Sequence, residues 1–469
     1  MAIVAGQAWG GGGTVNWSAS LQTQGYVRKE WADKGMPFFT SAEFQTCLDR
    51  VCDRMGVSAN HVEQNPTNAH LLEGARKLGW THKPVPQNTG GTKHYCGYCT
   101  LGCGSCEKQG PMVSFLPDAA KKGTQFIEGF DCREVIFETI DKIRTAVGVK
   151  GVWTSRDENG GVAGATRVSR EVIIRAKRVI ISGGTMQSPL LLLRSGIKNY
   201  HIGRNLKTHP VSFVGAVYPE ETRPWEGGIL TAVVNEFENL DGQGHGSKLE
   251  ATTMLPSLFL GFPPWRGGLD WKLFAAKFSN MVGYISLARD SGSGQVYPDP
   301  KDGRARYRYL PNAKDKKHIT EGLIGLAKIA YVEGASEIFT AIPAVPVFKR
   351  TVDARPQPAA DGSPDDGIND PAFNAWLDQI RKAGLPDADV LFLSAHQMGT
   401  CRMGTSAKNS VVDPKGKVWG TENLYVADAS VFPSASGVNP MITNMAISDW
   451  ISRGIDRELR QGSQVPSRL

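Results

Sequence analysis

Apolar and polar residues alternate along the chain in a way that predicts short strands, glycine turns and helices. The apolar run Val179–Ile181 predicts a buried strand that Ser182–Gly184 ends. Ser188–Pro189 then begins a helix that Gly196 stops. A buried strand, a glycine turn and a helix N-terminus are typical of a doubly wound α/β domain, where backbone N–H groups can hold an anion.

The same order of elements returns near the C-terminus. Leu424–Asp428 predicts a strand, Ser434–Pro440 a turn, and the segment from Ile442 to about Leu459 a helix. The residues between these two units have a different pattern. Prolines interrupt residues 211–390, and polar and apolar residues alternate in Arg304–Leu310. The sequence therefore predicts an α/β domain that is interrupted by a mixed α/β domain on an antiparallel sheet and then resumed.

Helices and strands are also predicted elsewhere in the chain. Helices are expected near Thr40–Met55, Asn68–Leu78 and Lys314–Tyr331. Between residues 111 and 178, Gln125–Phe130 and Cys132–Phe137 each predict a strand.

Composition and charge exclude several classes of protein. The 469 residues are 41% hydrophobic and 21% charged, which excludes a disordered or fibrous chain. No apolar stretch reaches the length of about 18 residues that a membrane-spanning helix needs. The net charge of +7 is spread over the chain without a basic stripe, so nucleic acid is not an expected partner. No basic segment followed by an apolar one opens the chain, so no secretory signal is expected.

A cysteine-rich loop contains Cys96, Cys99, Cys103 and Cys106 in a C-x₂-C-x₃-C-x₂-C pattern. Paired C-x₂-C motifs are typical of zinc or iron–sulfur sites, yet the gap between these two pairs is shorter than in the usual zinc ribbons. A glycine-rich loop with reduced thiols or one local disulfide is the preferred interpretation. No metal ligands are assigned, and a zinc or iron–sulfur module remains an alternative that metal analysis would test.

Two residues near the C-terminus are candidate catalytic groups. His396 follows a strand-like segment, Val390–Leu393, and precedes a glycine turn, which places an imidazole at a strand end. Histidine titrates near neutral pH, so it can accept a proton and return it. Asn439 precedes a proline and a helix, where its amide could hydrogen-bond a hydroxyl group.

The His396 segment, the turn at Ala427–Asp428 and Gly437–Pro440 together resemble the C-terminal active site of the glucose–methanol–choline (GMC) flavin oxidoreductases. Gly11–Trp17, Val179–Gly184 with Gln187–Pro189, and Ile202–Leu206 with His209–Pro210 belong to the same pattern. Within the family, the chain most resembles the long-chain fatty alcohol oxidases at His94–Gly104, Glu226–Gly228 and Tyr331–Ile338. These motifs occur in the family's order over nearly the whole chain.

The resemblance implies FAD as cofactor and a division of the chain. Residues 1–30, 111–210 and 391–460 would form the FAD-binding domain, 31–110 a loop and cysteine-rich cap region, 211–390 the substrate domain, and 461–469 a tail. The implied FAD-binding residues are Gly11, Gly12, Gly13, Asn16, Val135, Gly183, Ala427, Asp428, Pro440 and Met441.

The implied reaction is oxidation of a long-chain primary alcohol to the aldehyde, with oxygen reduced to hydrogen peroxide. His396 would accept the hydroxyl proton while Asn439 holds the alcohol oxygen in line. A same-family dehydrogenase with another electron acceptor is the alternative enzyme.

One departure from the family pattern is the phosphate-binding loop. No G-x-G-x-x-G occurs in the sequence, so we expect the first βαβ unit of the FAD domain to be missing from this chain. We accordingly expect the chain alone to bind FAD weakly or not at all. An inactive, N-terminally truncated fragment is therefore a further alternative, and a missing upstream segment could carry a membrane anchor.

The last three residues, Ser467, Arg468 and Leu469, resemble the Ser-Lys-Leu peroxisomal signal. This tripeptide predicts a peroxisomal import receptor as a partner, and a peroxisome suits an enzyme that releases hydrogen peroxide.

Overall fold

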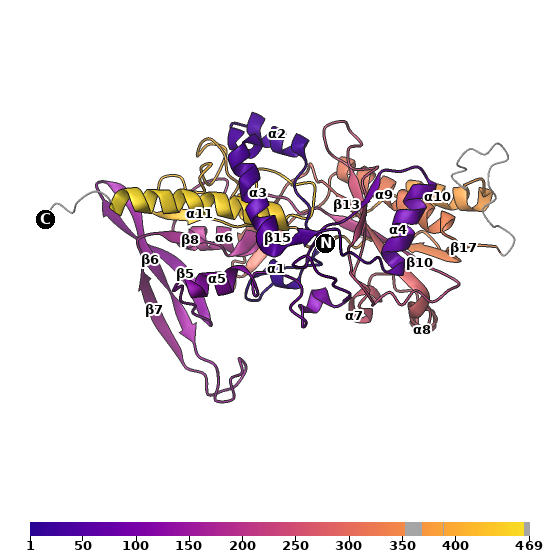
Figure 1. Ribbon diagram of the computed structural model, residues 1–469, viewed down its shortest axis with the longest axis horizontal. Helices are drawn as coiled ribbons and strands as arrows, with labels where there is room; N and C mark the ends of the chain where they lie inside the picture. Colours follow the sequence, from indigo (N-terminus) through magenta and orange to yellow (C-terminus); the bar gives the residue numbers. More distant parts are fainter. Residues whose placement is uncertain (352–367, 388, 464–469) are drawn as a thin grey trace.

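The computed structural model describes residues 1–351, 368–387 and 389–463. Two halves lie side by side along the long axis of the molecule (Figure 1), and each has its own hydrophobic core. A large mixed sheet dominates one half, and the C-terminal helix α11 (Met441–Ser463) runs along the other. The predicted α/β class is therefore confirmed.

The large sheet has the strand order β1-β18-β10-β13-β12-β11-β3, with β16 and β17 attached beside β10. Only β1 pairs in parallel, with β18, and the other strands of this sheet are antiparallel. The strands are β1 (Ala2–Ile3), β3 (His82–Pro84), β10 (Val211–Val217), β11 (Ala232–Val234), β12 (Ser247–Ala251), β13 (Met281–Ala288), β16 (Glu337–Thr340), β17 (Phe348–Lys349) and β18 (Leu393–Ser394).

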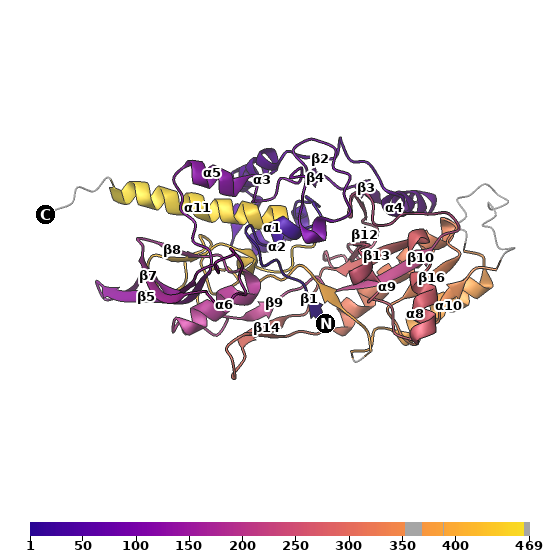
Figure 2. The same ribbon diagram turned by 90° about the horizontal axis from the view of Figure 1, so that it is seen from below.

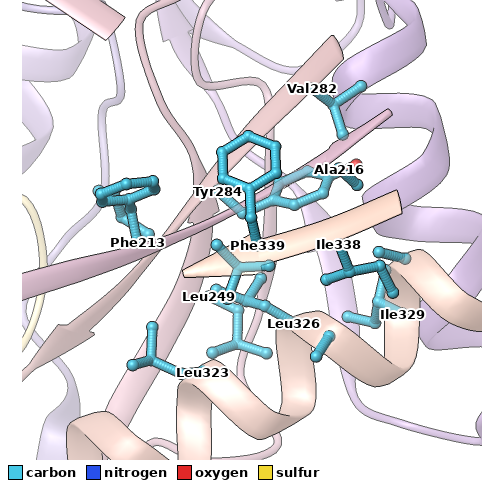
Figure 3. Packing of buried hydrophobic residues seen from close by; sticks show 14 of the residues in the cluster. Phe213, Ala216, Leu249, Val282, Tyr284, Leu323, Leu326, Ile329, Ile338 and Phe339 are labelled. Atoms are coloured by element: carbon cyan, nitrogen blue, oxygen red, sulfur yellow. The ribbon is translucent and has the colours of Figure 1, made fainter. Parts of the chain in front are cut away.

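Helix α9 (Ala313–Val332) covers one face of this sheet and buries most of its residues. The Asn312 side chain begins the helix by accepting a hydrogen bond from the Asp315 N–H. Gly322 lets the helix lie close to the sheet, because a Cβ there would overlap the hydroxyls of Ser247 and Ser286. Figure 3 shows Leu249 and Ile338 of the sheet beside Leu323, Leu326 and Ile329 of α9, whereas Phe213 and Phe339 lie on the opposite face of the sheet.

Further helices cover this half of the molecule (Figure 2). Helix α4 packs against α9 and β11, so the segment from α4 to β3 joins the large sheet although it precedes that domain in sequence. The helices are α4 (Pro66–Lys77), α7 (Pro256–Phe259), α8 (Gly268–Ala275) and α10 (Pro371–Ala383).

The other half contains the predicted strand–turn–helix units. Strands β8 (Val179–Ile181) and β19 (Leu424–Val426) pair in parallel. Helices α6 (Gly184–Arg194) and α11 follow them in sequence, and α3 (Ala42–Met55) packs against α11. Also in this half are α1 (Gly12–Val15), α2 (Gly25–Asp33), α5 (Phe115–Lys121) and a three-stranded antiparallel ribbon, β5 (Phe130–Ile140), β6 (Ile143–Thr154) and β7 (Ser169–Arg175). Two small sheets complete the fold: β2 (Val57–Ser58) with β4 (Gln87–Asn88), and β9 (Arg204–Leu206) with β14 (Gly294–Pro298) and β15 (Ala305–Arg308).

Two elements differ from the sequence-based expectation. Residues 125–129 form no strand, and β5 instead begins at Phe130, because Gly129 has a φ of 69° that ends the extended backbone. Helix α6 begins at Gly184, one turn before the predicted start at Ser188, and keeps Pro189 inside it. The carbonyl of Thr185, which Pro189 cannot bond, instead accepts a 2.7 Å hydrogen bond from the Thr400 hydroxyl.

No helix among the described residues is long and apolar enough to cross a membrane.

Candidate active site

The candidate site begins where β18 ends. His396 lies two residues after that strand, and its backbone N–H donates to the Ser394 hydroxyl at 3.3 Å. The Gln397 amide donates to the Ser394 carbonyl and hydroxyl, each at 2.9 Å. Side-chain hydrogen bonds therefore hold the backbone on both sides of His396.

His209 connects His396 to the C-terminal turn. It is fully buried, and its backbone N–H donates to Asp290 at 3.1 Å. Its Nε2 accepts a 3.1 Å hydrogen bond from the Gly437 N–H, so its proton lies on Nδ1. That Nδ1 lies 3.3 Å from Nδ1 of His396, to which it can donate. A neutral His396 in this arrangement has its own proton on Nε2.

Both rings stay neutral at physiological pH. Burial lowers the pKa of His396 to about 4. Burial, together with the nearby His396, Arg289 and Lys248, lowers the pKa of His209 well below its usual value. Neutral histidine is the form that can accept a proton.

The turn from Ser434 to Asn439 is fixed by groups from distant parts of the chain. Arg289, which is buried, donates from Nε to the Ala435 carbonyl at 2.9 Å and forms an ion pair with Glu30. The Gln24 amide donates to the Gly437 carbonyl at 3.3 Å. The position of Asn439 is thereby set by Gln24 and Glu30 near the N-terminus as well as by Arg289, which directly follows β13.

Asn439 is buried and has one side-chain partner among the described residues. Its Nδ2 donates to Oε2 of Glu250 on β12 at 3.3 Å. Burial raises the pKa of Glu250 to about 7, although the Asn439 amide and Lys248 act in the opposite direction. Asn439 and a carboxyl group that titrates near neutral pH are therefore in direct contact.

Part of the predicted cofactor-binding set lies beside the first turn of α11. The Nδ2 atom of Asn16 lies 2.7 Å from the sulfur of Met441. A Cβ added at Gly13 would lie 3.5 Å from the terminal methyl group of Met445. The structure thus brings Gly13 and Asn16 to the first turn of α11, which begins at Met441 two residues after Asn439.

The other predicted cofactor-binding residues gather around α6. Asp428 uses both carboxylate oxygens within the protein, where Oδ2 accepts from the Gly184 N–H at 2.8 Å and Oδ1 from the Ser430 N–H at 2.8 Å. The Ala427 carbonyl accepts from the Ser182 hydroxyl. These contacts fix the turn between β8 and α6, where Gly183 also lies.

Val135 lies at the other end of α6. Its N–H donates to the Ser195 hydroxyl at 2.8 Å. No hydrogen bond or ion pair among the described residues joins the side chains of Val135 or Asp428 to His396.

The cysteine-rich loop forms a separate polar cluster. His94 Nδ1 lies 2.7 Å from Glu107, and its Nε2 lies 3.4 Å from the sulfur of Cys99. In the part of the chain that the structure describes, no three His, Cys, Asp or Glu side chains are placed to hold a metal ion together. Burial raises the pKa of Cys99 to about 11, so its thiol is protonated at neutral pH.

Comparison with known proteins agrees with this architecture. Two family models, each described as GMC oxidoreductase, match residues 1–211 and 280–448. The chain therefore belongs to the GMC oxidoreductase family, whose cofactor is FAD.

Two relatives from Arabidopsis thaliana illustrate the similarity. The long-chain-alcohol oxidase FAO4A is 34% identical over 465 residues, which cover 97% of this chain and 59% of that protein. The long-chain-alcohol oxidase FAO3 is 31% identical and is matched over 98% of this chain and 60% of its own length. The chain spans about three fifths of the length of these curated relatives.

Solved structures share the fold at lower sequence identity. A formate oxidase from Aspergillus oryzae superposes with a TM-score of 0.66 at 17% identity, covering 98% of this chain and 85% of that chain. Pyridoxine 4-oxidase from Mesorbium loti superposes with a TM-score of 0.56 at 17% identity, covering 86% and 71% of the two chains.

Three residues at the site were not predicted from the sequence. The sequence pattern indicates His209 only as part of a motif, and it does not single out Arg289 or Glu250. The available signal for Glu250 was a charged residue inside a short strand-like segment, a pattern that water-exposed strand faces produce equally well.

Proposed function

We propose that this chain takes part in the FAD-dependent oxidation of a long-chain primary alcohol to its aldehyde, with oxygen reduced to hydrogen peroxide. The observation that supports this most directly is a neutral His396 joined through His209 to the turn that carries Asn439. The similarity to long-chain-alcohol oxidases supports the substrate class.

His396 and Asn439 have separate roles in this proposal. The hydroxyl proton of the alcohol passes to a lone pair of His396, and Asn439 positions the alcohol oxygen. The His396 ring must turn over for this step, because its lone pair on Nδ1 faces His209. The long 3.3 Å contact between the two rings is weak enough to be exchanged when substrate binds. FAD, when bound, supplies the acceptor for the hydride from the alcohol carbon.

The glycine run beside the first turn of α11 leaves space that a flavin could occupy. No atom lies within 4 Å of where a Cβ would stand at Gly11 or Gly12. The first N–H groups of α11, next to Pro440 and Met441, form the positive end of a long helix, which suits an electron-rich ring edge. We assign Gly11, Gly12, Gly13, Asn16, Pro440 and Met441 to this end of the cofactor.

The test is a titration followed by an assay. Flavin fluorescence would measure FAD binding to the purified chain. With saturating FAD, 1-dodecanol and oxygen, we expect dodecanal and hydrogen peroxide in equal amounts. Aldehyde formed only with an added dye acceptor would identify a dehydrogenase, and no aldehyde under either condition would contradict the proposal for this chain.

For location we propose the peroxisome, on the strength of Ser467, Arg468 and Leu469. These three residues lie outside the described part of the structure. A fluorescent protein fused in front of the whole chain, with the C-terminus free, should enter peroxisomes, and deletion of the tripeptide should abolish entry. Import that survives the deletion would contradict this assignment.

A further inference from the structure

Glu250 is a buried acid that faces the candidate site. It lies on β12, whose side chains alternate between the two faces of the sheet. Leu249 faces helix α9, since its Cδ2 atom lies 3.0 Å from a Cβ built at Gly322. Glu250 therefore faces the opposite side, where its Oε2 accepts from Asn439.

Both side chains of this pair keep one polar atom without a partner. Oε1 of Glu250 and Oδ1 of Asn439 are buried and accept no hydrogen bond from any described residue. A buried polar atom left unpaired destabilises the folded state. Such atoms at a candidate active site are explained if a ligand pairs with them when it binds.

We propose that Glu250 is a positioning residue that selects which end of the Asn439 carboxamide faces the alcohol. As a carboxylate it holds Nδ2 of Asn439 and leaves Oδ1 toward the substrate. As a neutral acid it donates its own proton to Oδ1, so that the amide turns over and presents Nδ2 to the alcohol oxygen. The proposal rests on the proposed function, because it names a further residue for the same reaction.

The two amide orientations differ in what they offer an alcohol. A hydroxyl group has one proton to donate, and in the proposed reaction that proton points at His396. An Nδ2–H donor then pairs with the alcohol oxygen and stabilises the negative charge that develops as the proton leaves. An Oδ1 acceptor instead faces a lone pair of the same oxygen and competes with His396 for the proton. The neutral form of Glu250 is therefore the productive one.

The charged groups around Glu250 leave its ionisation finely balanced. On β12 itself, Lys248 is paired with Glu238. Lys83 of β3 and Glu250 of β12 both pair with Val233 of β11, which lies between them in the sheet. Next to the turn from Ser434 to Asn439 lie the neutral His209 and His396. Arg289, which is paired with Glu30, lies there as well.

Burial raises the pKa of Glu250 to about 7 against the effect of the Asn439 amide and Lys248. The acid is accordingly neutral below about pH 7 and ionised above it. His396 is neutral above about pH 4. The productive combination of a neutral base and a neutral acid thus exists between these two values.

The test measures binding of 1-dodecanol to the purified chain by calorimetry, at about pH 5.5 and about pH 8.5, with and without FAD. One additional hydrogen bond, at about 1 kcal/mol, makes binding to the natural sequence about fivefold tighter at the lower pH. Glu250→Gln replaces the acid by an amide that does not titrate, so the affinity of this variant for 1-dodecanol should be the same at both pH values. Glu337→Gln, at the far end of the same sheet, is the matched control and should keep the pH dependence.

A second readout needs neither substrate nor cofactor. Infrared difference spectra between the two pH values should contain the C=O band of a buried neutral carboxylic acid, and Glu250→Gln should remove that band. Equal dodecanol affinity at both pH values, or a pH dependence that survives Glu250→Gln, would overturn the role of Glu250 and leave the proposed function intact. Absence of dodecanol binding at either pH, with FAD present, would overturn both.

Discussion

At the scale of single residues, the neutrality of His396 has a direct consequence for pH. Because burial lowers its pKa to about 4, the ring gains a proton and loses its function only as the pH falls through about 4. We expect kcat/KM for 1-dodecanol to fall on the acid side near that value. His396→Gln should lower kcat/KM by about 10²–10⁴-fold. His61→Gln, at an exposed histidine, should change neither rate nor profile.

The ion pair of Arg289 and Glu30 is a second feature at this scale, and it concerns stability. Burial acts to raise the pKa of Glu30, but Arg289 and Lys34 outweigh it and lower that pKa to about 2. The stabilisation is therefore complete above about pH 4.5, the ordinary value, and is lost as the pH falls toward 2. Removing the cation by Arg289→Met should lower the free energy of unfolding by about 3 kcal/mol.

Urea unfolding between about pH 2.5 and pH 7 would measure both effects. In Glu30→Gln, the free energy of unfolding should no longer contain the decrease at low pH that this ion pair causes. An Arg289→Met variant as stable as the natural sequence would show that the pair contributes nothing to the fixed turn.

At the scale of elements, two helix glycines should respond in opposite ways to alanine. In α9, a methyl group at Gly322 would displace the hydroxyls of Ser247 and Ser286, which donate to the carbonyls of His318 and Ile319 at 3.1 and 3.0 Å. Gly322→Ala should therefore lower the free energy of unfolding by about 1–3 kcal/mol.

In α11, by contrast, no atom lies within 4 Å of a Cβ built at Gly454. Gly454→Ala should raise stability by about 0.5–1 kcal/mol, because alanine has less backbone freedom to lose in a helix. Chemical denaturation of the two variants would compare them. A stabilising change at Gly322 would mean that α9 does not lie as close to the sheet as described.

The elements also show which parts of the fold the sequence could predict. Where periodicity and local stop signals agree, as in α3, α9 and β8, predicted and observed bounds differ by at most two residues. The start of α6 was missed because its first turn depends on Asp428 and Thr400, which are far away in the sequence. Local signals contain no information about such long-range partners.

At the scale of the whole molecule, burial is uneven in a way that hydrogen exchange would detect. Every residue of β10, β12 and β13 is buried, whereas β5 and β7 of the ribbon expose many of theirs. We expect amides in β10 and β13 to exchange slowest and those of β7 to exchange faster by orders of magnitude. Equal protection in the ribbon would indicate that another part of the molecule covers it.

The candidate site was predictable only in part, because local motifs indicate some of its residues whereas long-range contacts bring in the others. His396 and Asn439 stand in recognisable motifs, and the fold brings them to a shared network through His209. The contact between Asn439 and Glu250 joins residues 189 positions apart, so no local pattern indicates it. Asp428, in contrast, has a turn-fixing role that its motif did not distinguish from a cofactor contact.

The turn from Ser434 to Asn439 also makes the site a late product of folding. Its anchors are Gln24, His209 and Arg289, so three long loops of chain must close before the turn is held in place. Helices such as α9 and α11 can form well before that moment. In a refolding experiment the helical signal should consequently recover first, and the capacity to bind an alcohol should return only when the two ends of the polypeptide have met.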